Sequence, residues 1–311
     1  MSPNDVWAIT CYFNPAKFWQ RRINYRMFRH NLNLRLLTVE LSFNGEFELE
    51  AGDADRLIQL RDGDILWQKE RLLNIAASAL PASCAYVAWL DCDVVFGDDR
   101  WPMRARETLQ RAKLVQLFSR VIDLPKGVRT VPARASRVFR GVRSTMYAAH
   151  CGGDMTRSLR YPEHRSTEAT ANGLAWAARR EFFDAAALYD ACILGSGDRA
   201  LACALLQIPE VLVAALKFHP EHATHYLSWA KTVSDWVGGA HSALEGEIFH
   251  LWHGWPERRL LSTRYTGLHD FEFDPRKDIE LYSNQVWRWA SRKAAMHAYV
   301  RDYFQQRRED G

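Results

Sequence analysis

The sequence predicts an α/β fold with a mostly parallel, wound sheet. Two observations lead to this prediction. Apolar runs rich in β-branched and aromatic residues alternate with segments of helical spacing, and one apolar run ends directly at a pair of acids. The alternating segments are expected strands at 6–12, 36–41 and 85–90, and expected helices at 16–32 and 66–80. Strands and helices in this alternating order are typical of a parallel sheet with helices on its faces.

The rest of the chain continues this pattern with one interruption. We expect a helix at 101–113 and a strand at 114–118, followed by a long loop or small excursion over 119–170, where hydrophobic periodicity fades. Order resumes with an apolar segment at 173–178, a helix near 179–189, an alanine-rich helix after 197 and a strand at 249–252. From residue 284 we expect an amphipathic helix with Trp289, Ala290, Met296, Val300, Tyr303 and Phe304 on it.

The composition excludes several classes of protein. Of 311 residues, 48% are hydrophobic and 25% are charged, which is the balance of a globular chain with a sizeable core. Six cysteines without any C-x-x-C spacing predict a reduced, cytoplasmic protein with neither a disulfide framework nor a zinc knuckle. No apolar stretch is long enough for a membrane span, and the amino terminus lacks the pattern of a secretory signal.

Two aspartates, Asp91 and Asp93, follow the apolar run 85–90. Because side chains alternate along a strand, we expect both carboxylates to project to the same side, one pleat apart. Oxygen donors at the carboxyl end of a sheet strand suit a hard divalent cation that holds phosphates. The alternative is a polar junction that caps the next element.

A glycine-rich turn, Gly195-Ser196-Gly197-Asp198, leads into the alanine-rich helix. It formally matches the G-x-G-x-x-A pattern of dinucleotide-binding folds, but a carboxylate at Asp198 would repel a pyrophosphate at the start of that helix. We therefore expect Asp198 either to cap the helix, whose dipole favours a charged carboxylate, or to orient or deprotonate a substrate hydroxyl.

The run Asp91-Cys92-Asp93-Val94-Val95 also fits a phosphatase-like D-x-D-x-[T/V] pattern, in which the first aspartate is a nucleophile. Such enzymes need a later pair of metal-binding acids. Residues 199–202, which follow Asp198, do not supply the second acid. His250 and His253 instead supply imidazoles, which with the aspartates would make a mixed site for Mn²⁺ or Mg²⁺. Structural hydrogen bonding is the alternative role of these histidines.

Taken in order, these segments resemble metal-dependent nucleotide-sugar glycosyltransferases of the GT-A class. Asp91-Cys92-Asp93 is similar to the D-x-D of that family, 173–180 to its G-x-A-W-A-x-R-R stretch, 195–198 to its G-G-G-D turn and 250–254 to its carboxyl-terminal histidine segment. The resemblance spans residues 6–260 and implies one GT-A-like domain. Its expected parts are a nucleotide-sugar-binding half (1–118), a basic loop or insertion (119–170), an acceptor-side half (171–260) and a C-terminal helical extension (261–311).

The resemblance also implies a site. A cation, Mn²⁺ or Mg²⁺, held by Asp93, Asp91 and one of His250 and His253, would bridge the diphosphate of a nucleotide-sugar donor, expected to be a UDP-sugar. The expected donor contacts are Thr10, Tyr12, Asn14, Asp91, and Lys69 or Arg71, although a solvated helix face is an alternative for the last two. Asp198 would be the catalytic base in an inverting enzyme and would position the acceptor in a retaining one.

The acceptor is predicted from charge. Residues 119–165 carry Lys126 and nine arginines but only three acids, whereas the net charge of the whole chain is +4. The arginines are Arg120, Arg129, Arg134, Arg137, Arg140, Arg143, Arg157, Arg160 and Arg165. This stretch would form a footprint for a polyanion. The chain is also broadly similar to glycosyltransferases, often phage-encoded, that modify hydroxymethylated bases in DNA, so we expect duplex DNA as the acceptor, in the host cytoplasm for a phage protein. The alternatives are a solvated loop or a lid over the diphosphate, a glycan or lipid acceptor, a metal-dependent phosphohydrolase, and a non-catalytic nucleic-acid-binding protein.

Overall fold

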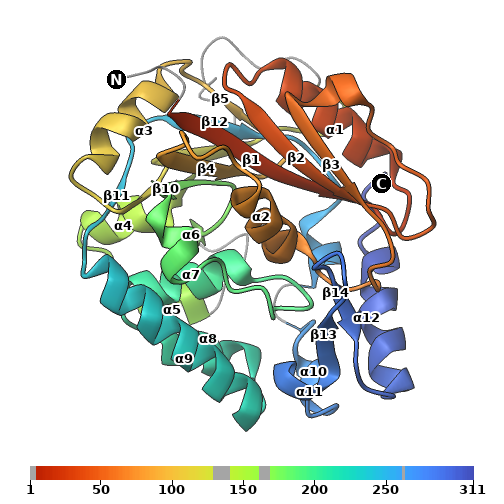
Figure 1. Ribbon diagram of the computed structural model, residues 1–311. Coiled ribbons are helices and arrows are strands. Elements are labelled where there is room, and N and C mark those ends of the chain that lie inside the picture. Colours follow the sequence, from red (N-terminus) through yellow and green to blue (C-terminus); the bar gives the residue numbers. More distant parts are fainter. Residues whose placement is uncertain (1–4, 129–140, 161–168, 261–262) are drawn as a thin grey trace.

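The centre of the computed structural model, which describes residues 5–128, 141–160, 169–260 and 263–311, is a seven-stranded sheet (Figure 1). Its strands, in spatial order, are β11 (His241–Ala243), β6 (Leu114–Gln116), β10 (Ala175–Arg179), β4 (Tyr86–Leu90), β1 (Val6–Phe13), β2 (Leu36–Leu41) and β3 (Arg56–Leu60). Neighbouring strands are parallel except for β10, which runs antiparallel to β4 and β6. The predicted α/β class with a mostly parallel sheet is confirmed.

The central strands are covered by helices on both faces. β1, β2 and β4 are nearly continuous runs of buried residues, as expected for strands without a solvent face. Trp7 and Ile9 of β1 pack into the core under α2 (Lys69–Ser78) and α7 (Gly197–Leu205), whereas Ala8 packs toward α1 (Trp19–His30) and α3 (Trp101–Leu109). Alternation along β1 therefore divides the interior into two layers.

The remaining helices lie on one side of the sheet in Figure 1, with α8 and α9 beside α7, and α10 to α12 grouped near β13 and β14. Their bounds are α4 (Thr145–His150), α5 (Met155–Arg160), α6 (Glu181–Ala185), α8 (Pro209–Leu216), α9 (Pro220–Val237), α10 (Thr266–His269), α11 (Pro275–Asp278) and α12 (Ala294–Gln306). Separate short 3₁₀ helices span Ala51–Asp53 and Pro256–Arg259. No helix among the described residues has the length and apolar character needed to cross a membrane. All six cysteines are free thiols.

A second sheet of five strands runs through the stretch where a loop was expected. Its spatial order is β5 (Val94–Phe96), β12 (Glu247–His250), β7 (Arg120–Asp123), β8 (Gly141–Ser144) and β9 (Thr170–Ala171). The loop prediction for 119–170 is therefore wrong in its described part; residues 129–140 and 161–168 lie outside the description. These strands have at most four residues each, too few to show a period, and β7 finds its parallel partner β12 far along the chain.

The C-terminal helix begins later than expected. Trp289 lies in β14 (Trp287–Trp289), which pairs antiparallel with β13 (Ile279–Leu281), and Ala290 follows that strand. The prediction of a helix from residue 284 is wrong because partners outside this segment bind its backbone: Gln68 and Asp64 hydrogen-bond to residues of β14. The predicted apolar positions at 296, 300, 303 and 304 are confirmed as the buried face of α12.

Candidate functional site

The ends of β1 and β4 open onto a cavity of about 300 Å³. Its walls come from segments far apart in the sequence: the end of β1, the turn after β4, the start of α7, the end of β12 and the tail after α12. The structure brings together on this cavity seven of the predicted site residues, namely Thr10, Lys69, Asp91, Asp93, Asp198, His250 and His253. Most of the predicted site residues therefore share one cavity.

The two aspartates after β4 lie at a turn and not on a strand. β4 ends at Leu90, residues 92–93 form a turn, and β5 begins at Val94. The expectation that both carboxylates project to one side as alternate strand residues is therefore wrong. The turn allows Asp91 to face Lys69 while Asp93 faces the two histidines, so each aspartate belongs to a different cluster.

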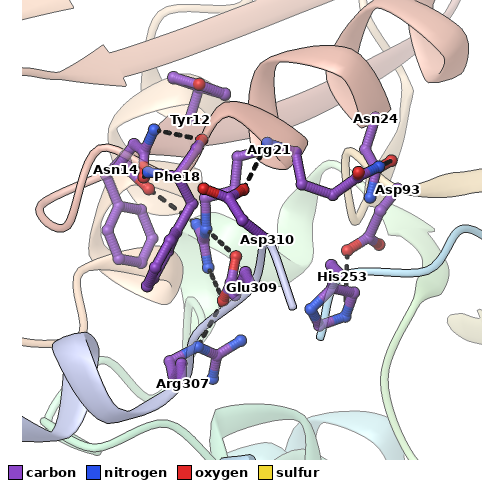
Figure 2. Close-up of polar contacts among 12 residues, drawn as sticks. Tyr12, Asn14, Phe18, Arg21, Asn24, Asp93, His253, Arg307, Glu309 and Asp310 are labelled. Carbon is purple, nitrogen blue, oxygen red and sulfur yellow. Dashed lines mark hydrogen bonds and ion pairs between the residues drawn. The ribbon is translucent and has the colours of Figure 1, made fainter. Parts of the chain in front are cut away.

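Asp93, His250 and His253 form the first cluster, in which three possible metal-ligand atoms lie within 4.8 Å of one another. His253 Nε2 is 3.4 Å from Asp93 Oδ2 and 3.1 Å from His250 Nε2; Figure 2 shows Asp93 facing His253. Asp93 Oδ1 is buried and has no hydrogen-bond partner among the described residues. A buried carboxylate oxygen in this state is costly unless a cation or a donor meets it.

The surroundings act in opposite directions on the two imidazoles. Burial lowers the pKa of His250, but the hydrogen bond from its Nδ1 to Asp123 (2.7 Å) and the nearby carboxylates outweigh this effect and raise it. Burial, together with the charge of Arg259, holds the pKa of His253 well below its usual range, so this ring is neutral. Asp123 fixes the proton on Nδ1 of His250 and leaves Nε2 facing Asp93, which is how metal-binding histidines are usually held. Two imidazoles and a carboxylate suit Mn²⁺ better than Mg²⁺, which prefers oxygen ligands.

Lys69 is the centre of the second cluster. Its Nζ lies 2.5 Å from Asp91 Oδ1 and 2.7 Å from Asp198 Oδ2. Asp198 is in the first turn of α7, and a Cβ at Gly173 would lie 2.5 Å from its carboxylate, so only glycine allows this close approach. Burial raises the pKa of Asp91 to about 6, against the opposing charge of Lys69. The lysine therefore holds two carboxylates of the cavity in fixed positions.

Glu70, next to Lys69, is a buried acid outside the cavity lining. Its side chain is packed against Gly197, and its Oε1 has no hydrogen-bond partner among the described residues. Burial raises the pKa of Glu70 to about 8, although Lys69 opposes this shift. The group is therefore mostly protonated in the folded protein at neutral pH.

Glu70 is expected to make the free energy of unfolding depend on pH. Because its folded pKa of about 8 lies above the ordinary value of 4.5, the folded state keeps a proton that the unfolded chain releases between these values. Stability should then fall as pH rises through this window, by at most about 1.4 kcal/mol per pH unit for one proton. Glu70→Gln should remove this slope in urea unfolding measured from pH 5 to 8. Glu245→Gln, at an exposed position, is the control, and an unchanged slope in Glu70→Gln would contradict the assignment.

Three predicted donor contacts lie elsewhere. The Tyr12 hydroxyl donates to Glu48 at 2.6 Å and the Asn14 amide donates to the same carboxylate at 3.1 Å, and both residues line a smaller cavity of about 160 Å³. Arg71 is paired with Asp190 at 3.1 Å and does not line the main cavity. Thr10 does line it, and its hydroxyl donates to the Leu90 carbonyl at 2.7 Å.

Sequence reasoning missed a group of charged residues on the cavity wall: Arg21, Asp123, Arg199, Arg259, Arg264, Arg307 and Glu309. In Figure 2, Glu309 lies between Arg21 and Arg307, with its oxygens 2.5 Å from the Nε of each. Burial raises the pKa of Glu309, but the two guanidinium groups outweigh this and lower it to about 2. For Arg307 and Glu309, the signal in the sequence is the charged run 307–310 directly after an amphipathic helix.

Comparisons with known proteins give weak similarities. No family model and no curated protein matches the chain. Among solved structures, glucosyl-3-phosphoglycerate synthase from Mycobacterium tuberculosis in complex with Mn²⁺, UDP and phosphoglyceric acid has 13% identity and a TM-score of 0.40, over 90% of this chain and 82% of that one. S. aureus TarS 1-349 in complex with UDP has 9% identity and a TM-score of 0.40, over 87% and 66%. A 4-diphosphocytidyl-2C-methyl-D-erythritol synthase from Anaerococcus prevotii has 9% identity and a TM-score of 0.36, over 78% and 87%. Likenesses this low assign neither a family nor an activity to the chain.

Proposed function

We propose that this chain is a metal-dependent, GT-A-like glycosyltransferase that moves a sugar from a nucleoside-diphosphate donor to an acceptor hydroxyl. The observation that carries the proposal is the convergence of Asp93, His250 and His253 on a cavity that is also lined by several arginines. Such a site can hold a divalent cation and the diphosphate of a donor together. The parallel sheet supports the proposal, because ligands of such sheets bind at the carboxyl ends of the strands.

The two clusters of the cavity would have different roles in sugar transfer. A bound cation would supply charge stabilisation for the diphosphate as it leaves. Arg259 donates to His253 Nε2 at 2.9 Å; a cation bound to this nitrogen would displace the guanidinium, which could then meet a diphosphate oxygen. In the second cluster, Lys69 holds Asp198 at the start of α7, where the carboxylate can accept a proton from the acceptor hydroxyl.

Thermal unfolding with nucleotides and metals tests this proposal. UDP with Mn²⁺ should raise the melting temperature by about 5 °C at concentrations near 100-fold above the dissociation constant, and neither component alone should do so. GDP, CMP and the replacement of Mn²⁺ by Mg²⁺ test the choice of base and cation. Absence of any nucleotide response, together with release of phosphate from simple esters, would favour a phosphohydrolase and contradict the proposal.

The finer prediction concerns DNA as the acceptor. Of the arginines that led to it, Arg120 is paired with Glu247 at 3.0 Å, and Arg143, Arg157 and Arg160 are exposed. The others, Arg129, Arg134, Arg137, Arg140 and Arg165, lie outside the described residues. Transfer to a hydroxymethylated base in duplex DNA stays a prediction from resemblance and charge. Micromolar protein should retard duplex DNA in a gel at low salt and lose this effect steeply as salt rises; unchanged mobility would contradict it.

A further inference from the structure

Two buried arginines on the cavity wall have no carboxylate partner among the described residues. Arg199 is 5% exposed and Arg264 is 6% exposed, and both line the cavity. The side chain of Arg199 makes no hydrogen bond or ion pair with any described residue, and its Nε and one terminal nitrogen are fully buried. The Nε of Arg264 is likewise buried without a partner in the described chain. Within the described part of the chain, these two positive charges are thus withdrawn from water without a counter-charge.

The fold holds these charges in place despite their cost. Burial and the charge of Arg264 lower the pKa of Arg199 to about 10, which leaves it protonated at neutral pH. Arg264 is fixed by hydrogen bonds to the Ser196 hydroxyl (2.7 Å) and the Tyr303 hydroxyl (2.8 Å). Ser196 itself has a φ of +87°, a conformation that side chains rarely adopt. A buried, uncompensated charge is expensive unless an opposite charge arrives to meet it.

Three other cationic residues of the cavity, Arg21, Arg307 and Lys69, have carboxylate partners. Glu309 compensates Arg21 and Arg307, and Lys69 holds Asp198 at 2.7 Å, so this carboxylate is partly neutralised. Arg259 adjoins the histidine cluster, where the donor diphosphate is proposed to bind. Arg199 directly follows Asp198 in the chain, at the amino-terminal end of α7, whose dipole also favours an anion. Arg264 hydrogen-bonds to Ser196, two residues before Asp198, so both arginines are tied to the turn that carries the proposed acceptor carboxylate. Because no carboxylate among the described residues meets them, a ligand anion can supply the partner.

We propose that Arg199 and Arg264 form a subsite for a carboxylate or phosphate group carried by one of the two substrates, close to the hydroxyl that reacts at Asp198. The inference rests on the proposed function and adds a substrate class to it. The anion is additional to the donor diphosphate, and it enters a cavity of about 300 Å³, so it belongs to a small molecule or to the end of a larger one. It belongs either to an anionic acceptor or to a donor sugar with an acidic group.

Two experimental arms distinguish these sources. In the first, protein saturated with UDP and Mn²⁺ is titrated with glycerol 3-phosphate, glycerate and uncharged glycerol, with the melting temperature as the readout. In the second, UDP-glucuronate is compared with UDP-glucose in the presence of Mn²⁺. The anionic member should bind at least about tenfold more tightly than its neutral counterpart in one arm, because a hydrogen bond to a buried charge is strong.

Arg199→Met separates a ligand site from a structural role. This variant should unfold at a higher temperature than the wild type without ligand, because an uncompensated buried charge is removed, and it should lose the preference for the anion. If Arg199 instead stabilised the fold, Arg199→Met would unfold at a lower temperature than the wild type. Ser196→Gly suits the positive φ and removes one of the two hydrogen bonds that fix Arg264, so it should weaken the same preference. Arg301→Met, at an exposed position of α12, is the matched control and should change neither property.

The outcomes are separable. If wild type responds to UDP with Mn²⁺ but shows no preference for an anion in either arm, or if Arg199→Met keeps the preference, the subsite is refuted while the proposed function stands. If hydroxymethylated duplex DNA raises the melting temperature of both the wild type and Arg199→Met, the anion subsite is also refuted. Absence of the UDP and Mn²⁺ response itself would contradict the proposed function and, with it, the role of this subsite in sugar transfer.

Discussion

Asp93→Asn is expected to weaken the Mn²⁺-dependent part of UDP binding by more than about 100-fold, since even residues that only support a metal ligand cost 10- to 100-fold when replaced. The asparagine keeps the shape of the side chain but removes the negative charge that faces His250 and His253. Calorimetric titration of Mn²⁺ into protein with UDP measures the loss directly. The effect should be large because Asp93 is the one carboxylate among the three candidate ligands that converge in the described part of the chain.

Two companion variants make this result specific. Asp123→Asn should give an intermediate loss, within about 10- to 100-fold, because it loosens the ring of His250 without removing a ligand. Asp99→Asn, at an exposed position shortly after β5, should leave Mn²⁺ binding unchanged. If Asp93→Asn binds Mn²⁺ and UDP as tightly as Asp99→Asn does, the assignment of the metal ligand is wrong.

Asp198→Asn is expected to lower turnover by about 10²- to 10⁴-fold, the usual contribution of a positioned acid or base. Binding of UDP with Mn²⁺ should be retained, because Asp198 lies in the Lys69 cluster and not among the three metal-site residues. Slow release of UDP from UDP-glucose, with water in place of the acceptor, provides a readout that needs no identified acceptor. Lys69 keeps its contact with Asp91 in this variant, so the fold around α7 should persist.

Asp235→Asn, at an exposed position of α9, serves as the control for charge removal. The two variants should differ in turnover and agree in nucleotide binding. Equal turnover in both would exclude Asp198 as the group that receives the proton. Loss of UDP binding in Asp198→Asn would instead place this carboxylate on the donor.

Much of the fold was predictable because its signals are local. β2 has the predicted bounds, and β1, β4 and the buried face of α12 lie where apolar runs and helical spacing predicted them. The strands β7, β8 and β9 were missed because they are short and find their partners through distant segments. The same reason explains β14, whose residues have helical spacing but hydrogen-bond with Gln68 and Asp64.

The candidate site was likewise predictable only where its signals are local in the sequence. The sequence by itself determined that two aspartates follow a buried strand and that a glycine-rich turn and a histidine pair come later, since each is a short run of adjacent residues. Only the tertiary structure decided that these residues form two clusters, one of Asp93 with the histidines and one of Asp91 with Lys69 and Asp198. It alone placed Asp123 behind His250 and left Arg199 and Arg264 without a carboxylate among the described residues. The physical reason is that burial and the distances between charges depend on segments brought together by folding, whereas a motif records only neighbours along the chain.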